Sequence, residues 1–185
     1  MFRTILALLL VVGVMATFAA AGSAIFTSTA SVTANTFTTG TLTLTASPST
    51  ALITYTNMAP GDMVTAPLTV ADTGTLALRY AMTTTISAET GGLGSQLVLE
   101  IRSGVTTCTN GGFGGGTSVY SGTLASALFG SPAQGNQAGD RTLAGPGSEV
   151  LCFQARLPIT TDNTFQGKAV TAQFNFAAEQ TANNP

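Results

Sequence analysis

The sequence lacks histidine and tryptophan and is very poor in charge. Charged residues make up only 8% of the 185 positions, whereas a typical soluble domain has about 25%. Without histidine, Ser-His-Asp triads and histidine-based zinc sites are excluded. The six Lys and Arg residues and the net charge of −2 offer no basic patch for a nucleic-acid backbone. We therefore expect no nucleic-acid partner.

The eight carboxylates are spread singly and do not form the D-x-D-x-D-G run of a calcium loop. The glycine-rich run 111–116 lacks the Lys-Ser/Thr of a phosphate-binding loop, so we interpret it as an irregular loop. We expect no catalytic residue, no cofactor and no metal. A hydrolase that uses two carboxylates brought together by the fold stays open as a minor hypothesis.

The N-terminus has the order of a secretory signal peptide. Arg3 precedes an apolar run from Ile5 to Ala21, and small residues follow as far as Ala24. Cleavage is expected after Ala21 or after Ala24. The alternative is a retained membrane anchor, because the run is at the lower limit for crossing a bilayer core of about 30 Å. We predict a signal peptide at 1–24 and an exported mature chain long enough for one domain with a real core.

Two cysteines, Cys108 and Cys152, are present. In an exported protein an even number of cysteines predicts an intramolecular disulfide. A loop of this length would contribute roughly 4 kcal/mol to stability in the chain-entropy account. Two free thiols or an intermolecular bond are the alternatives.

Apolar and polar residues alternate in six stretches of the mature chain. In each stretch one face is apolar and the other carries Thr, Gln or charge, which is typical of half-buried antiparallel strands. Turn signals separate them at Pro60-Gly61, Asp72-Thr73-Gly74 and Gly145-Pro146-Gly147. Outside the signal, only Leu124 to Phe129 indicates a helical turn. The stretches are 42–44, 64–70, 76–82, 97–101, 151–157 and 170–176.

The predicted fold class is an all-β antiparallel sandwich of jelly-roll type, preceded by an N-terminal signal helix. The sandwich is expected at 37–180, with a Gly/Ser-rich insertion at about 109–147 and a polar tail at 181–185. Residues 25–36 form a separate strand segment. Its part 25–35 is β-prone and contains no charge, Pro or Gly. The residues alone leave open whether this strand pairs within its own sandwich or with another chain.

Three blocks of sequence together resemble the TasA/camelysin family. The first consists of Ala24-Ile25-Phe26 and the run from Asn35 to Leu44. The second consists of the run 57–62 and the run 72–76, and the third of Phe165-Gln166-Gly167 and the run 174–180. The blocks keep the same order and span the mature chain.

The resemblance implies cleavage between Ala24 and Ile25 and an exported jelly-roll subunit of biofilm-matrix or cell-surface fibres. In such fibres the N-terminal strand of one subunit completes a sheet of the next, and head-to-tail insertion gives an open filament. The implied polymerisation strand comprises Ile25, Phe26, Thr27, Ser28, Thr29, Ala30, Ser31, Val32, Thr33, Ala34 and Asn35.

The implied partners are copies of this chain, minor fibre subunits, matrix polysaccharide and, during export, signal peptidase. The cysteine pair resembles that of a subset of the family and should stabilise the subunit outside the cell.

Part of the family has been described as a metalloprotease, an activity that a chain without histidine does not support. A monomeric surface or coat binding module is the alternative function, although three tyrosines (Tyr55, Tyr80, Tyr120) and no tryptophan offer little for stacking on sugars.

Overall fold

The computed structural model describes residues 36–184. The predicted signal peptide at 1–24, the cleavage pair Ala24 and Ile25, and the polymerisation strand 25–35 lie outside these residues. The chain divides into two units, 1–38 and 39–185, and every element described below belongs to the second unit. Within the described part of the chain, no helix has the length and apolar character needed to cross a bilayer.

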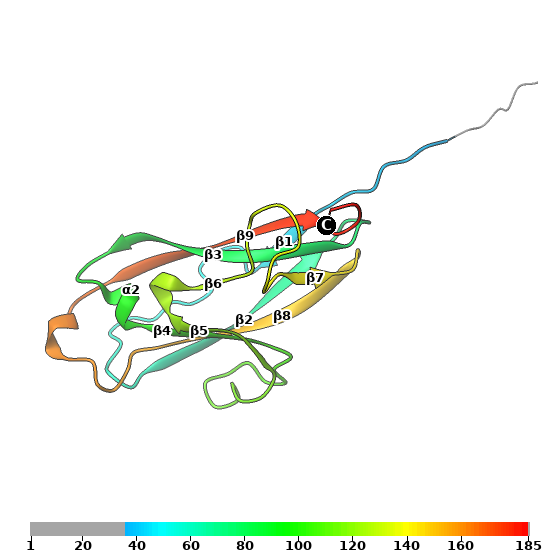
Figure 1. Cartoon of the computed structure of the whole chain (residues 1–185). Coiled ribbons are helices and arrows are strands. Elements are labelled where there is room, and N and C mark those ends of the chain that lie inside the picture. Colours follow the sequence, from blue (N-terminus) through cyan, green and yellow to red (C-terminus); the bar gives the residue numbers. More distant parts are fainter. Residues whose placement is uncertain (1–35, 185) are drawn as a thin grey trace, which may run out of the picture. The chain divides into compact units, whose positions relative to one another are not determined.

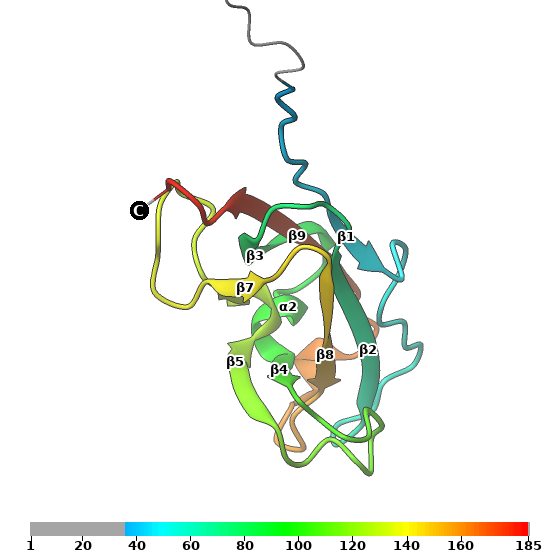
Figure 2. The same cartoon turned by 90° about the vertical axis from the view of Figure 1, so that its right-hand side faces the viewer.

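Two antiparallel sheets make up this unit (Figures 1 and 2). The first has five strands in the order β1-β2-β8-β4-β5, and the second has β3 at its centre, β9 on one side and β6 and β7 on the other. The strands are β1 (Leu44–Ser47), β2 (Met63–Asp72), β3 (Leu78–Glu89), β4 (Val98–Ser103), β5 (Thr117–Thr123), β6 (Leu128–Phe129), β7 (Arg141–Leu143), β8 (Gly147–Arg156) and β9 (Val170–Gln180). The helical pieces are α2 (Leu93–Gln96), η1 (Leu124–Ser126) and η2 (Asn163–Phe165).

The observed architecture confirms the all-β, antiparallel part of the predicted fold class. Each of the six alternating stretches overlaps one of the strands β1, β2, β3, β4, β8 and β9. The predicted helical turn corresponds to η1, which begins at Leu124. The jelly-roll type and the signal helix stay predictions.

The core lies between the two sheets and takes side chains from both. Leu99, Ile101 and Phe153 come from the first sheet, Leu78 and Met82 come from the second, and all five are fully buried. Buried aliphatic and aromatic area of this kind is the main favourable term in folding. The core holds β3 and β8 rigidly in place, and these strands position the edge strands discussed below.

Five consecutive residues of β3, 78–82, are buried, as are residues 151–155 of β8. The alternating pattern predicted instead that one face of each strand would meet solvent. The outer face of β3 is covered by the loop 130–140, where Gly130 approaches Ala81 and the amide of Gly135 bonds to Glu179. The outer side of β8 is covered by a loop that is tied to it through Cys152.

The segment 109–147, predicted as an insertion, contributes to both sheets. It contains β5, η1, β6 and β7, and it buries Leu124, Phe129 and Leu143 in the core. These apolar positions occur in clusters too short to establish a strand period, which explains why the sequence pattern indicated an insertion instead.

Candidate functional site at an open sheet edge

The outer edge of β9 is the longest strand edge that the second sheet leaves without a partner. Within residues 36–184, β9 pairs with β3 alone, and it does so along eleven residues. Exposed edges are usually protected by Pro, charge or a bulge. From Val170 to Ala178 the strand carries neither Pro nor charge, and the bulge in this ladder, at Ser87, lies on β3. The backbone of β9 is therefore suited to accept another strand.

The inward face of β9 is apolar but incompletely buried. Phe174 packs on Phe153 with ring centroids 5.1 Å apart, and Phe176 lies 6.2 Å from Tyr80. The apolar residues of β9 nevertheless remain partly exposed, whereas Met82 and Tyr80, which lie opposite Phe176 and Ala178 on β3, are buried. A further strand beside β9 would remove the remaining apolar surface from water. This apolar row consists of Val170, Ala172, Phe174, Phe176 and Ala178.

The edge strand β1 of the first sheet lies beside β9, as both views show (Figures 1 and 2). The two strands belong to different sheets. Leu44 and Ala46 of β1 are half-buried against the core. Beyond β1, the irregular segment 48–62 adds the half-buried Leu52 and Ile53. We call this side of the sandwich, where both sheets end, the open side.

The start of the sandwich is clamped by the turn after β2. Thr73 and Thr75 donate their amides to the carbonyl oxygens of Thr43 and Thr41, each at 2.9 Å. The amide of Thr41 in turn donates to the Thr75 hydroxyl at 2.9 Å. A β-carbon on Gly74 would lie 2.4 Å from the Thr41 oxygen, so only glycine permits this approach. We call residues 40–43 the anchor.

Asp72 shapes the turn that holds the anchor. Its side chain is 1% exposed, and one carboxylate oxygen accepts the Gly74 amide at 2.8 Å. This is the arrangement by which Asp stabilises a tight turn. The sequence identified Asp72-Thr73-Gly74 as a turn, but nothing in it indicated that the turn binds the first residues of the sandwich.

A polar network connects the two sheets. The Tyr80 hydroxyl on β3 donates to Glu149 on β8 at 2.6 Å, and the guanidinium of Arg141 on β7 forms two bonds to the same carboxylate. Burial raises the pKa of the Tyr80 phenol, and the Glu149 hydrogen bond raises it further. The Glu149 contact likewise raises the pKa of Arg141. The network therefore fixes the spacing of the sheets and leaves no free acid or base.

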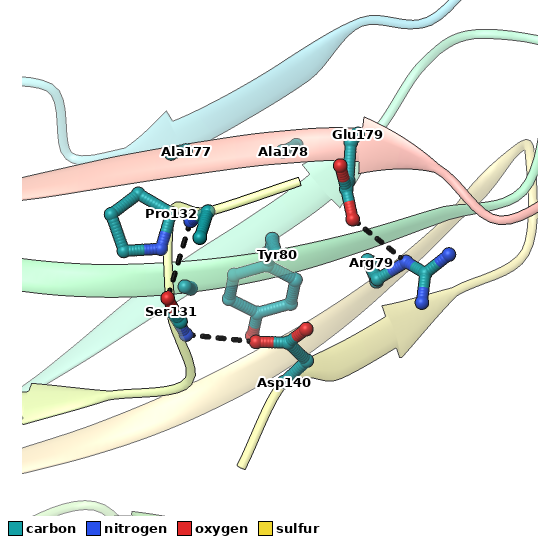
Figure 3. A pocket seen from close by; sticks show the side chains of 10 residues that line it. Arg79, Tyr80, Ser131, Pro132, Asp140, Ala177, Ala178 and Glu179 are labelled. Carbon is teal, nitrogen blue, oxygen red and sulfur yellow. Dashed lines mark hydrogen bonds and ion pairs between the residues drawn. The ribbon is translucent and has the colours of Figure 1, made fainter. Parts of the chain in front are cut away.

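A small cavity lies under the loop 130–140, beside Tyr80 and β9 (Figure 3). Arg79 pairs with Glu179 at 3.0 Å, and Asp140 accepts the Ser131 amide at 2.9 Å. The cavity has a volume of about 30 Å³, which accommodates a water molecule but no organic ligand. Its polar groups hold the loop on β3 and β9.

Cys108 and Cys152 form a disulfide with their Cα atoms 5.6 Å apart. The same loop is held by Phe113, which is 7% exposed and lies under the Arg102 guanidinium, 5.5 Å from the ring centroid. Arg102 is itself paired with Glu100 at 2.6 Å. The disulfide thus fastens the glycine-rich loop to the first sheet.

Each of the eight Asp and Glu side chains accepts a hydrogen bond or pairs with an arginine. Asp62 accepts the Ala59 amide at 2.8 Å, and Glu89 accepts the Gly94 amide. Two hydrogen bonds from Thr164 lower the pKa of Asp162. The remaining carboxylates, Asp72, Glu100, Asp140, Glu149 and Glu179, bind the turn, arginines and loop described above. This arrangement gives no support to a carboxylate pair poised for glycoside hydrolysis.

A family model described as camelysin metallo-endopeptidase matches residues 4–91. The match covers the anchor, β1, β2 and β3, and it confirms the resemblance stated from the sequence blocks. No curated protein matches the chain.

The residues present do not fit the metal that this description implies. The chain has no histidine, and its two cysteines are joined to each other. Among the residues that the structure describes, no three residues of the His, Cys, Asp and Glu types come together as a metal site would require. We therefore derive no catalytic step through a metal.

Proposed function

The family model matched over residues 4–91 supports the resemblance to the TasA/camelysin family, and on this premise we propose that the chain is an exported structural subunit that polymerises head to tail. The segment 25–35 of one copy would add to the free edge of β9 in the next copy. The role would be structural and not enzymatic, and the location would be the cell surface or the extracellular matrix. The single observation that carries the proposal is the half-buried edge of β9, which has no charged residue from Val170 to Ala178.

The donated segment matches the β9 edge in length and pattern. Residues 25–35 number eleven, and β9 is also eleven residues long. With a period of two, Phe26, Ala30, Val32 and Ala34 would share one face with a single polar residue, Ser28, and this face would extend the apolar row of β9. The other face would begin with Ile25 and otherwise carry Thr, Ser and Asn. Main-chain hydrogen bonds would supply affinity, and the apolar face would fix the register.

Strand direction favours exchange between copies over insertion into the same copy. The anchor bonds to Thr75 and Leu76, and Thr181, at the end of β9, bonds to the adjacent Ala77. The anchor therefore lies at the end of the sandwich where β9 finishes. If a chain folded back on its own β9, its segment 25–35 would run parallel to that strand. A strand that arrives from a neighbour at the opposite end would run antiparallel, as every pairing in these sheets does.

The tyrosines give the monomeric binding module little support. Tyr80 is 1% exposed and Tyr120 is half-buried, so Tyr55, at 48%, is the one exposed residue among the three tyrosines. Stacking on sugar rings uses exposed aromatic faces. We retain matrix polysaccharide and minor fibre subunits as expected partners of the polymer.

Negative-stain electron microscopy of the mature chain 25–185 at rising concentration tests the proposal. We expect thin filaments from the parent chain and none from Val32→Asp, because that charge would enter the apolar face of the donated strand. The matched control is Thr33→Asp, on the opposite face, which should still polymerise. Equal behaviour of the two variants, or a monodisperse parent chain, would contradict strand donation.

Deletion of residues 25–35 provides a second test. All the core residues found among residues 36–184 belong to the unit 39–185. The shortened chain should therefore remain a folded monomer with an unchanged unfolding curve. Loss of folding would show that the segment is an integral part of its own sandwich.

A further inference from the structure

We propose that the end of the sandwich opposite the anchor is a second contact between copies. This inference rests on the proposed function. The contact surface, which we call the far-end patch, consists of Tyr55, Met63 and Ile159. Its occupant is the anchor end of the next copy of this chain.

The far-end patch gathers exposed apolar residues around one turn, Ala59 to Asp62. The exposed fraction is 75% for Ile159, 48% for Tyr55 and 36% for Met63. Ile159 lies 3.1 Å from the point where a β-carbon on Gly61 would sit. The Tyr55 hydroxyl donates to Asp62 at 3.1 Å, and Met63 follows directly. Single exposed apolar residues are ordinary, but a cluster around one turn marks an interaction site.

The patch is held in a fixed shape. The amide of Gly61 donates to the Leu157 oxygen at 2.8 Å, and the amide of Leu157 donates to the Asp62 oxygen at 3.0 Å. Within the turn, the Asp62 amide donates to the Ala59 oxygen at 2.9 Å. A preformed surface loses little conformational freedom on binding, so its apolar area contributes efficiently to association.

The patch and the anchor lie at opposite ends of the sandwich. β2 begins at Met63 beside the patch and ends at Asp72 beside the anchor, ten residues later. The strand therefore separates the two by about 30 Å. β9 begins at the patch end, on the left of Figure 1 together with α2 and η2. A neighbour's strand that runs antiparallel to β9 would therefore end, with Asn35, at the patch end.

A short tether then brings the two copies together. Four residues, 36–39, separate Asn35 from Gly40, where the anchor begins. Fully extended, they span at most about 14 Å. The anchor end of the donating copy must therefore lie against the patch end of the accepting copy. Leu42, which is 38% exposed, is the apolar residue that the anchor presents for this contact.

The test compares Ile159→Ser with the matched control Leu128→Ser in the mature chain. Leu128 is also exposed, at 54%, but lies on β6, on the side of β3 away from β9. Sedimentation gives the critical concentration for polymerisation. We expect Ile159→Ser to raise it about tenfold, as loss of one buried aliphatic side chain would, and Leu128→Ser to leave it unchanged. Circular dichroism checks that both variants fold.

Binding of a synthetic 25–35 peptide to the chain that lacks these residues separates the two proposals. The peptide should bind both serine variants with the affinity of the parent. If the peptide binds and Ile159→Ser polymerises as well as the control, the far-end contact is wrong and strand donation stands. If the peptide does not bind and the parent does not polymerise, strand donation and the contact that rests on it both fail.

Discussion

Removal of the disulfide, by Cys108→Ala combined with Cys152→Ala, should lower the free energy of unfolding by about 4 kcal/mol at 25 °C. The two cysteines are 44 positions apart. In the chain-entropy account, closure of a loop of this length removes about 13 cal/mol/K from the unfolded ensemble, which gives that figure. Cys152 is 1% exposed in β8, so alanine introduces no polar group into the buried site.

Urea unfolding followed by circular dichroism measures the effect. With a slope of about 2 kcal/mol/M, the midpoint should fall by about 2 M. The parent chain under reducing conditions is the matched control and should show a similar loss. Filaments should still form, because the disulfide belongs to the first sheet and the accepting edge to the second. A fall of the urea midpoint by less than about 0.5 M would contradict the account in which the disulfide stabilises the fold by constraining the unfolded chain.

Three further changes test the structure. Glu149→Gln weakens the pair with Arg141 and the bond from Tyr80, and should cost about 2 kcal/mol in urea unfolding, because the pair is mostly buried. Tyr80→Phe should remove a loss of stability above about pH 10, where the unfolded chain ionises this tyrosine and the folded chain, with its raised pKa, keeps the proton. Below that pH the parent chain keeps the full stability contributed by the protonated Tyr80. The free energy of unfolding, followed from pH 8 to 11, should therefore fall more steeply in the parent than in Tyr80→Phe. Gly74→Ala should displace Thr41 and lower the free energy of unfolding by about 1–3 kcal/mol. Limited proteolysis should then cleave the anchor faster than in the parent. An unchanged cleavage rate would contradict the role of this turn in holding the anchor.

Strand positions could be predicted because local alternation determines them. Val64, Leu68 and Val70 occupy alternate positions separated by residues such as Thr65 and Thr69, and they fall within β2 as predicted. The same pattern did not predict burial on the outer face of β3, where Arg79 is 5% exposed. The loop that covers this face comes from residues 130–140, and such distant contacts leave no periodic signal in the strand itself.

Composition predicts a strand at residues 25–35, because they lack charged side chains, Pro and Gly, and this stays a prediction outside the described residues. The accepting edge could not be predicted from the sequence. The pattern of β9 is that of any half-buried strand, and its lack of an outer neighbour within residues 36–184 depends on the order of strands in the sheet. The anchor was missed for a similar reason: Thr41 and Thr75 meet across 34 positions.

Residue-resolved hydrogen exchange tests strand donation most directly. The measurement compares filaments of the mature chain with the folded chain that lacks residues 25–35. We predict that free amides along Val170–Gln180 become protected at least tenfold in the filament, because the donated strand pairs with them. If β9 exchanged equally fast in both samples, while another edge such as Thr117–Thr123 became protected, the assignment of β9 as the accepting edge would be contradicted.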